Sequence, residues 1–166
     1  GWRLQQFESL MKLNIYMVVF TDNDCYDSLC ELCASYANHV YIHPPLAKEE
    51  WFTYQHCHLE NTEALPSTRN YTKDTFLFMM LMNEKPIFVQ RSVILNYWKT
   101  HYFGWIDFSI GYILKTPNNS LKTLQTVCNH SFFHNDSFLY IPGCWTPLEY
   151  INMDYLAHNV VWRFCG

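Results

Sequence analysis

A run of six consecutive apolar or aromatic side chains, IYMVVF at residues 15–20, constrains the fold more than any other feature of the sequence. It ends at Thr21 and Asp22, two polar residues. Such a run is too short for an ordinary buried helix, and a strand with one solvated face would alternate apolar and polar side chains. The run therefore predicts a strand that is buried on both faces, as in a parallel sheet covered by helices.

Other short apolar runs alternate with segments of helical periodicity. Further strands are expected at residues 40–42, 103–108, 138–141 and 160–164. Helices are expected over residues 2–13, 26–36, 73–82, 87–98 and 119–130. We expect Asp24 to cap the helix at 26–36 and Pro86 to separate the two central helices. This alternation indicates an α/β fold with a mainly parallel sheet.

Length and composition narrow the class of protein. A chain of 166 residues has the size of one domain, and we treat residues 1–166 as a single α/β domain. A hydrophobic content of 49% argues against a disordered chain, and a formal charge of -4 argues against a nucleic-acid partner. No apolar run reaches the roughly 18 residues that span a membrane.

The two ends of the sequence and its sequons bear on context. The chain opens in a helix-like segment and closes directly after a strand-like one, so we expect an internal part of a longer protein, incomplete at both ends. Four N-x-Ser/Thr sequons, which begin at Asn70, Asn118, Asn129 and Asn135, hint at a secretory lumen. Localisation is otherwise undetermined.

One carboxylate, Asp107, interrupts the aromatic segment THYFGWIDFSIG at residues 100–111. It lies near the end of the predicted strand 103–108, and open α/β sheets bind ligands just outside the carboxyl ends of their strands. A carboxylate in that position can bind a hard cation. The alternative is a structural carboxylate that caps the following turn through the backbone N–H of Ser109 or Ile110. The residues alone leave both interpretations open.

The cysteines invite a zinc interpretation that their spacing does not favour. Cys30-x-x-Cys33 is followed by His-Cys-His at residues 56–58. Cys33 falls on the apolar face of a predicted helix, and the later trio fits no standard zinc interval. We therefore expect buried or free thiols rather than a zinc or redox site.

Two cations are also candidates for a site. Lys85 stands between Glu84 and Pro86, where a solvated surface lysine is the usual outcome. Arg163 is flanked by Trp162 and Phe164 in a predicted strand. A guanidinium in an apolar strand needs an acidic or phosphate partner, so Arg163 is the stronger candidate of the two.

A longer pattern surrounds Asp107. An aromatic and aliphatic helix leads to Asn-x-Lys at Asn83 and Lys85, a second helix follows, and a Thr-x-x-Phe segment then runs into Trp-Ile-Asp at residues 105–107. This block, residues 72–111, resembles the core of the HtrL/YibB-like family. MVVFTD at 17–22 and VVWRFCG at 160–166 resemble further strands of the same family.

That family is similar to nucleotide-sugar-dependent glycosyltransferases of the GT-A type and is associated with surface-polysaccharide genes in bacteria. The resemblance implies a Rossmann-like, GT-A-like parallel sheet flanked by helices. In GT-A enzymes an Asp-x-Asp motif holds a divalent metal, Mn²⁺ or Mg²⁺, on the donor diphosphate. The resemblance places the first Asp of that motif on Asp107. The second position, usually Gly in the family, is Ser109 here.

The resemblance also implies a set of donor-binding residues. They are Thr21, Asp22, Asn83, Lys85, Trp105, Ser109 and Arg163. Lys85 and Arg163 would neutralise charge on the leaving diphosphate, and Thr21 and Asp22 would meet the base or ribose. The implied partners are a nucleotide-sugar donor and an undetermined glycan, lipid or protein acceptor. The resemblance assigns no catalytic residue.

Three functions follow as hypotheses. The first is a glycosyltransferase fragment that supplies the donor and metal part of the site and has no turnover alone. The second is a non-catalytic carbohydrate- or protein-binding module, which Ser109 and the aromatic content of 18% favour. The third is a structural α/β domain in which Asp107 only caps a turn.

Overall fold

The computed structural model describes residues 2–56, 69–108, 110 and 117–129. The chain forms two compact units. The first comprises residues 1–46, 92–138 and 166, and the second comprises residues 47–91 and 139–165. The described residues form several helices and a small parallel sheet, so the chain is a mixed α/β protein, as predicted.

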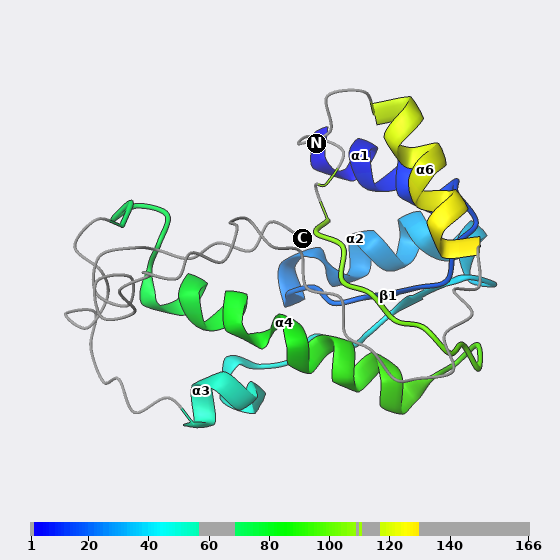
Figure 1. Ribbon diagram of the computed structural model, residues 1–166. Coiled ribbons are helices and arrows are strands. Elements are labelled where there is room, and N and C mark those ends of the chain that lie inside the picture. The colour runs from blue at the N-terminus through cyan, green and yellow to red at the C-terminus, as the bar shows by residue number, and fades with distance from the viewer. Residues whose placement is uncertain (1, 57–68, 109, 111–116, 130–166) are drawn as a thin grey trace, which may run out of the picture. The chain divides into compact units, whose positions relative to one another are not determined.

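The sheet of the first unit consists of β1 (Met17–Val19) and β2 (Val40–Ile42), which pair in parallel with Met17 opposite Val40. A hydrogen bond of 2.9 Å from the His43 N–H to the Val19 carbonyl extends the pairing beyond β2. Helix α2 (Asn23–Cys33) and a 3₁₀ turn, η1 (Ala34–Tyr36), connect the strands (Figure 1). Residues 17–19 of the apolar run thus form a parallel strand, as predicted, but the run is not buried on both faces, because Tyr16 is 58% exposed and Val19 is the one buried residue of β1.

Helix α2 begins earlier than predicted, because Asp22 and not Asp24 is its N-cap. Asp22 has an extended backbone, and its Oδ1 accepts a hydrogen bond of 2.9 Å from the Cys25 N–H. A capping side chain reaches the free N–H groups of the first turn from just outside the helix, and Asp24 already lies within that turn. The predicted cap at Asp24 is therefore wrong.

The core of the first unit joins its helices to the sheet. Helix α1 (Trp2–Met11) and helix α6 (Pro117–Asn129) lie side by side (Figure 1), and the Gln125 side chain donates a hydrogen bond of 2.7 Å to the Leu13 carbonyl. The buried members of this core are Phe7, Leu10, Met11, Val19, Leu29, Cys33, Val40 and Ile42. The predicted helices at 2–13 and 119–130 are confirmed, with small shifts at their ends.

The second unit contains a 3₁₀ turn, η2 (Lys48–Glu50), helix α3 (Phe52–His56) and most of helix α4 (Phe76–Leu95). We predicted two helices separated at Pro86, but α4 is a single helix that contains this proline. Its buried residues Met80, Glu84 and Phe88 recur every four positions across Pro86. An interior proline costs a helix about 3 kcal/mol, and the burial of two large apolar side chains offsets that cost.

Residues 103–108 do not form the predicted strand. In the part of the chain that the structure describes, β1 and β2 pair only with each other. The segment is held instead by its side chains: the Phe108 ring stacks on Phe7 of α1 with centroids 4.5 Å apart. The predicted strands at 138–141 and 160–164 lie outside the described residues.

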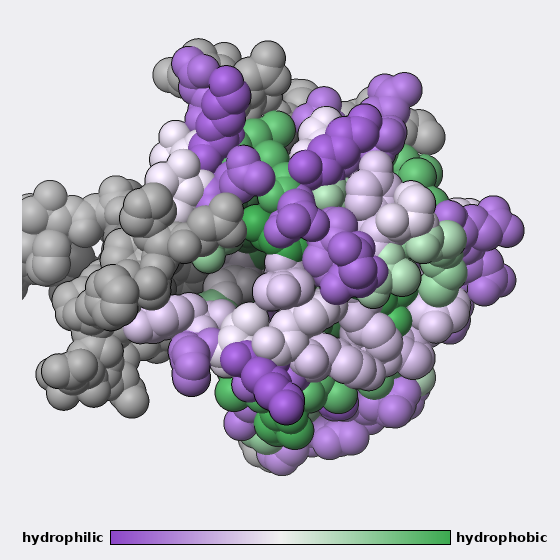
Figure 2. Space-filling model, turned by 90° about the vertical axis from the view of Figure 1, so that its right-hand side faces the viewer, coloured by the Kyte–Doolittle hydropathy of each residue, from purple (hydrophilic) through white to green (hydrophobic). Residues whose placement is uncertain are grey.

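Large apolar and aromatic side chains reach the surface of both units. Figure 2 shows one face on which green and pale residues, the colours of apolar side chains and those of intermediate hydropathy, lie among purple hydrophilic ones. Exposed examples are Tyr16 and Ile94 in the first unit and Tyr71 and Leu77 in the second. No helix among the described residues is long and apolar enough to cross a membrane.

Candidate functional site

The Asp107 carboxylate is held by its neighbour two residues earlier. The Trp105 indole Nε1–H donates a hydrogen bond of 2.8 Å to Asp107 Oδ1. The two side chains are thus in direct contact although only one residue separates them in the sequence. The structure thus places two of the predicted site residues in direct contact, and both are half-buried.

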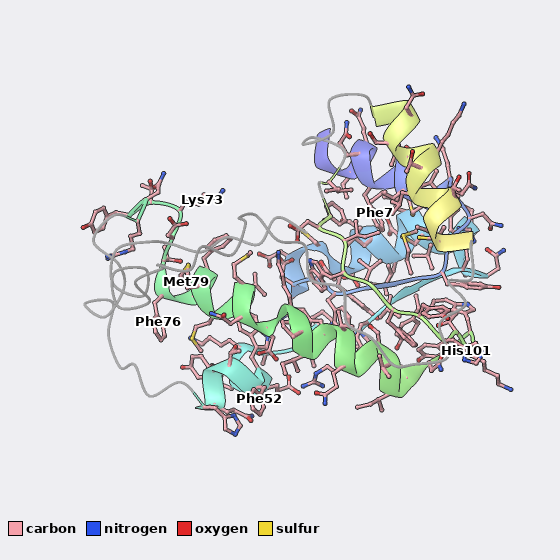
Figure 3. The ribbon with its side chains drawn as sticks, viewed as in Figure 1. Phe7, Phe52, Lys73, Phe76, Met79 and His101 are labelled. Carbon is pink, nitrogen blue, oxygen red and sulfur yellow. The ribbon has the colours of Figure 1, made fainter. Side chains whose placement is uncertain are left out.

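The chain on either side of Asp107 is also fixed. The Ile110 N–H donates a hydrogen bond of 3.0 Å to the Asp107 backbone carbonyl, which closes a turn after the carboxylate. Phe7 points from α1 toward this segment (Figure 3), where it stacks on Phe108. Ile110 packs against the same core. The turn predicted as the alternative for Asp107 is present, but the hydrogen bond that closes it goes to the backbone carbonyl.

Thr21 and Asp22 follow the carboxyl end of β1, where the sequence placed them. Asp22 is exposed, and its Oδ1 caps α2. The ring of Phe20 stacks on that of His43, which follows the end of β2, with centroids 4.8 Å apart. The carboxyl edge of this small sheet therefore carries a polar side chain pair next to a pair of stacked rings.

Asn83 and Lys85 lie on α4 in the second unit. Successive residues of an α-helix are rotated by about 100°, so side chains two positions apart leave the helix in different directions. Asn83 is exposed, and its amide donates a hydrogen bond of 2.9 Å to the Met79 carbonyl of its own helix. Lys85 is half-buried.

The residue between them, Glu84, was missed from the sequence and is fully buried. Its carboxylate accepts three hydrogen bonds: from the Phe52 N–H at 3.0 Å, the Thr53 N–H at 2.9 Å and the Thr53 hydroxyl at 2.7 Å. Phe52 begins α3 (Figure 3), so Glu84 satisfies the first free N–H groups of that helix from α4. The spacing of Glu84 with Met80 and Phe88 was the signal in the sequence that could have shown its burial.

Burial and hydrogen bonding raise the pKa values of two thiols on α2. Burial, aided by Cys30, raises the pKa of the Cys33 thiol to about 11, so Cys33 is protonated and unreactive near neutral pH. The hydrogen bond and charge of Asp22 raise the pKa of the exposed Cys25 thiol. Cys30 and Cys33 of the CxxC pair are free thiols on α2.

The remaining predicted residues, Ser109 and Arg163, lie outside the described residues. Within the described parts of the chain, no group of three or more His, Cys, Asp and Glu side chains could hold a metal ion. Comparison with protein-family models, with curated proteins and with solved structures found no match.

Proposed function

We propose that the chain contributes the donor-binding and metal-binding part of a nucleotide-sugar-dependent glycosyltransferase. The observation that carries this proposal is the Asp107 carboxylate, which Trp105 holds within the Trp-Ile-Asp element that resembles the HtrL/YibB-like family. A ligand residue whose position is fixed before binding loses little entropy when the metal arrives. The parallel β1-α2-β2 unit supports the finer proposal of a Rossmann-like, GT-A-like sheet.

The chemistry of the donor set fits a hard divalent ion. Asp107 offers carboxylate oxygens, and Ser109 offers a hydroxyl two residues later. Mg²⁺ and Mn²⁺ prefer oxygen ligands, and Mg²⁺ is commonly held by one or two carboxylates together with substrate phosphates. A carboxylate has about four acceptor sites, and the Trp105 hydrogen bond uses one of them.

The proposed reaction needs positive charge near the donor diphosphate, because negative charge develops there as the sugar leaves. A bound divalent ion would supply part of that charge. Within the first unit, which also contains Asp107, we propose that Thr21 and Asp22 contact the nucleoside. The roles that the resemblance implies for Asn83, Lys85 and Arg163 stay predictions. We also propose that the chain is HtrL/YibB-like and that it acts in polysaccharide biosynthesis.

A second candidate function is a non-catalytic carbohydrate- or protein-binding module. Ser109 in place of a second acidic ligand and the exposed aromatic side chains of the first unit favour it. Such a module would bind its ligand without a metal and without a nucleotide.

Thermal denaturation with a panel of nucleoside diphosphates, each with and without Mn²⁺, separates the two functions. A ligand that binds only the native state raises its stability by about 2.7 kcal/mol at a hundredfold excess over Kd. The glycosyltransferase proposal expects one nucleotide to raise Tm only when Mn²⁺ is present. An unchanged Tm with every nucleotide and metal combination would contradict it.

A further inference from the structure

A pocket of about 420 Å³ lies in the first unit, and none of the donor-binding candidates that the structure describes lines it. Its size falls within the range of about 300 to 1,000 Å³ that is typical of small-molecule sites. The lining residues are Cys30, Cys33, Ala34, Ala37, Val40, Tyr41, Ile42, Tyr97 and Trp98.

The pocket follows the whole of β2, because Val40, Tyr41 and Ile42 all line it. Thr21 and Asp22, which follow the carboxyl end of β1, are not among its lining residues. A ligand that contacts only the lining residues therefore does not contact this pair.

Aromatic side chains in fixed positions form one wall of the pocket. Tyr97 and Trp98 lie in the turn after α4, just before His101, which Figure 3 labels. The Trp98 Nε1–H donates a hydrogen bond of 3.1 Å to the Asn38 carbonyl, and the Trp98 ring stacks on Tyr16 with centroids 5.1 Å apart. Rings held in this way offer a large contact surface with little loss of side-chain entropy.

A pair of tyrosines supplies the polar edge of the pocket. The rings of Tyr41 and Tyr97 lie 4.3 Å apart, and the neighbouring Tyr97 hydroxyl raises the pKa of Tyr41. A phenol hydroxyl both donates and accepts, so the pair keeps capacity for a ligand hydroxyl. Tyr97 is 51% exposed and is open to an incoming ligand.

The uncharged lining of the pocket indicates which class of ligand it can bind. Among the described residues that line the pocket there is no Lys, Arg, His, Asp or Glu. A phosphate or carboxylate would lose its hydration there without gaining a partner, so the pocket favours an uncharged ligand. The ligand must also offer an apolar face to the rings and hydroxyl groups to the tyrosine pair, and a pyranose ring has both.

We propose that this pocket binds an uncharged sugar ring, with its apolar face on Tyr97 and Trp98 and its hydroxyl groups toward the Tyr41–Tyr97 pair. The site goes beyond the proposed donor function, because it needs neither Asp107 nor a metal.

The test is saturation-transfer NMR on the full chain with maltose, cellobiose and lactose, beside indole as a neutral aromatic compound and UDP as a charged one. We expect at least one disaccharide to bind, and Tyr97→Ala to weaken that binding at least tenfold. Tyr102→Ala is the matched control, because Tyr102 is an exposed tyrosine of the same unit that does not line the pocket. It should bind like the wild type.

Tyr97→Phe keeps the ring and removes only the hydroxyl. It should weaken disaccharide binding several-fold and lower the pKa of Tyr41, since the Tyr97 hydroxyl is the main cause that raises that pKa. A spectrophotometric titration of the tyrosines reports this shift even where a binding signal is weak. Binding of indole without any disaccharide, binding that Tyr97→Ala leaves unchanged, or no disaccharide binding at all would each overturn the proposal.

Discussion

The indole of Trp105 and the carboxylate of Asp107 are joined by a hydrogen bond of 2.8 Å, in a segment that carries no regular secondary structure. Packing of Phe108 on Phe7 fixes the backbone just after the carboxylate. The acid that stands out in the aromatic segment is therefore accommodated by a neighbouring donor and by its partial exposure. This arrangement explains how the segment can pack against a core without an unpaired buried charge.

Asp22 caps α2 through a side-chain oxygen and also carries a negative charge, and two substitutions distinguish the effects of the oxygen and of the charge. Asp22→Ala should destabilise the first unit by about 1 kcal/mol, because the Cys25 N–H loses its acceptor. Asp22→Asn keeps a capping oxygen and should retain near wild-type stability in urea denaturation. Both variants should lower the pKa of the Cys25 thiol, measured by the pH dependence of its alkylation. An equal loss of stability in the two variants would contradict the capping role.

Because Glu84 is buried and bonds Thr53, we predict that the stability of the second unit depends strongly on the Thr53 side chain. Thr53→Val removes the hydroxyl that bonds Glu84 at 2.7 Å and should cost about 1 to 3 kcal/mol in the free energy of unfolding. Glu84→Ala leaves two N–H groups of α3 unpaired and should cost more. Thr123→Val is the control, because the Thr123 hydroxyl is exposed and bonds only its own helix. A Thr53 variant as stable as the Thr123 control would contradict the packing of α3 on Glu84.

The buried thiol of Cys33 predicts a loss of stability in alkaline solution. Its pKa is raised from 9.0 to about 11 in the folded chain, so the unfolded chain releases this proton first as the pH rises. The contribution is fully present below pH 9.0 and is lost as the pH rises toward about 11. Its size is at most about 3 kcal/mol, since each pKa unit corresponds to about 1.4 kcal/mol. Cys33→Ala should flatten this part of the stability curve, measured by urea denaturation at each pH. A slope equal to that of the wild type would show that Cys33 is not buried as described.

Local patterns predicted much of the first unit. The continuous apolar run at residues 15–20 identified β1, and the periodicity of residues 26–36 identified α2, whose predicted apolar face contains the buried Leu29 and Cys33. The cap was misplaced because Asp22 and Asp24 have the same side chain, and only the backbone at the helix start distinguishes them.

The errors arose where tertiary contacts override a local signal. Pro86 is a strong helix breaker, yet burial of residues on both sides of it sustains α4. Residues 103–108 have strand-like composition, but Phe108 finds its partner on a helix. In the candidate site, the sequence pointed to Trp105 and Asp107 but could not show that they bond each other. It also passed over Glu84, whose partners Phe52 and Thr53 are distant in sequence.

The most direct test of the central claim is the binding of Mn²⁺ in the presence of UDP, GDP or ADP, followed by the loss of the free Mn²⁺ signal in electron paramagnetic resonance. Asp107→Asn removes the charge and keeps an oxygen that can accept from Trp105. Trp105→Phe removes the donor and keeps the carboxylate. We predict that the wild type binds Mn²⁺ with one of these nucleotides, that Asp107→Asn loses this binding, and that Trp105→Phe weakens it. Equal Mn²⁺ binding by the wild type and Asp107→Asn, or none by either, would contradict the assignment of Asp107 as a metal ligand.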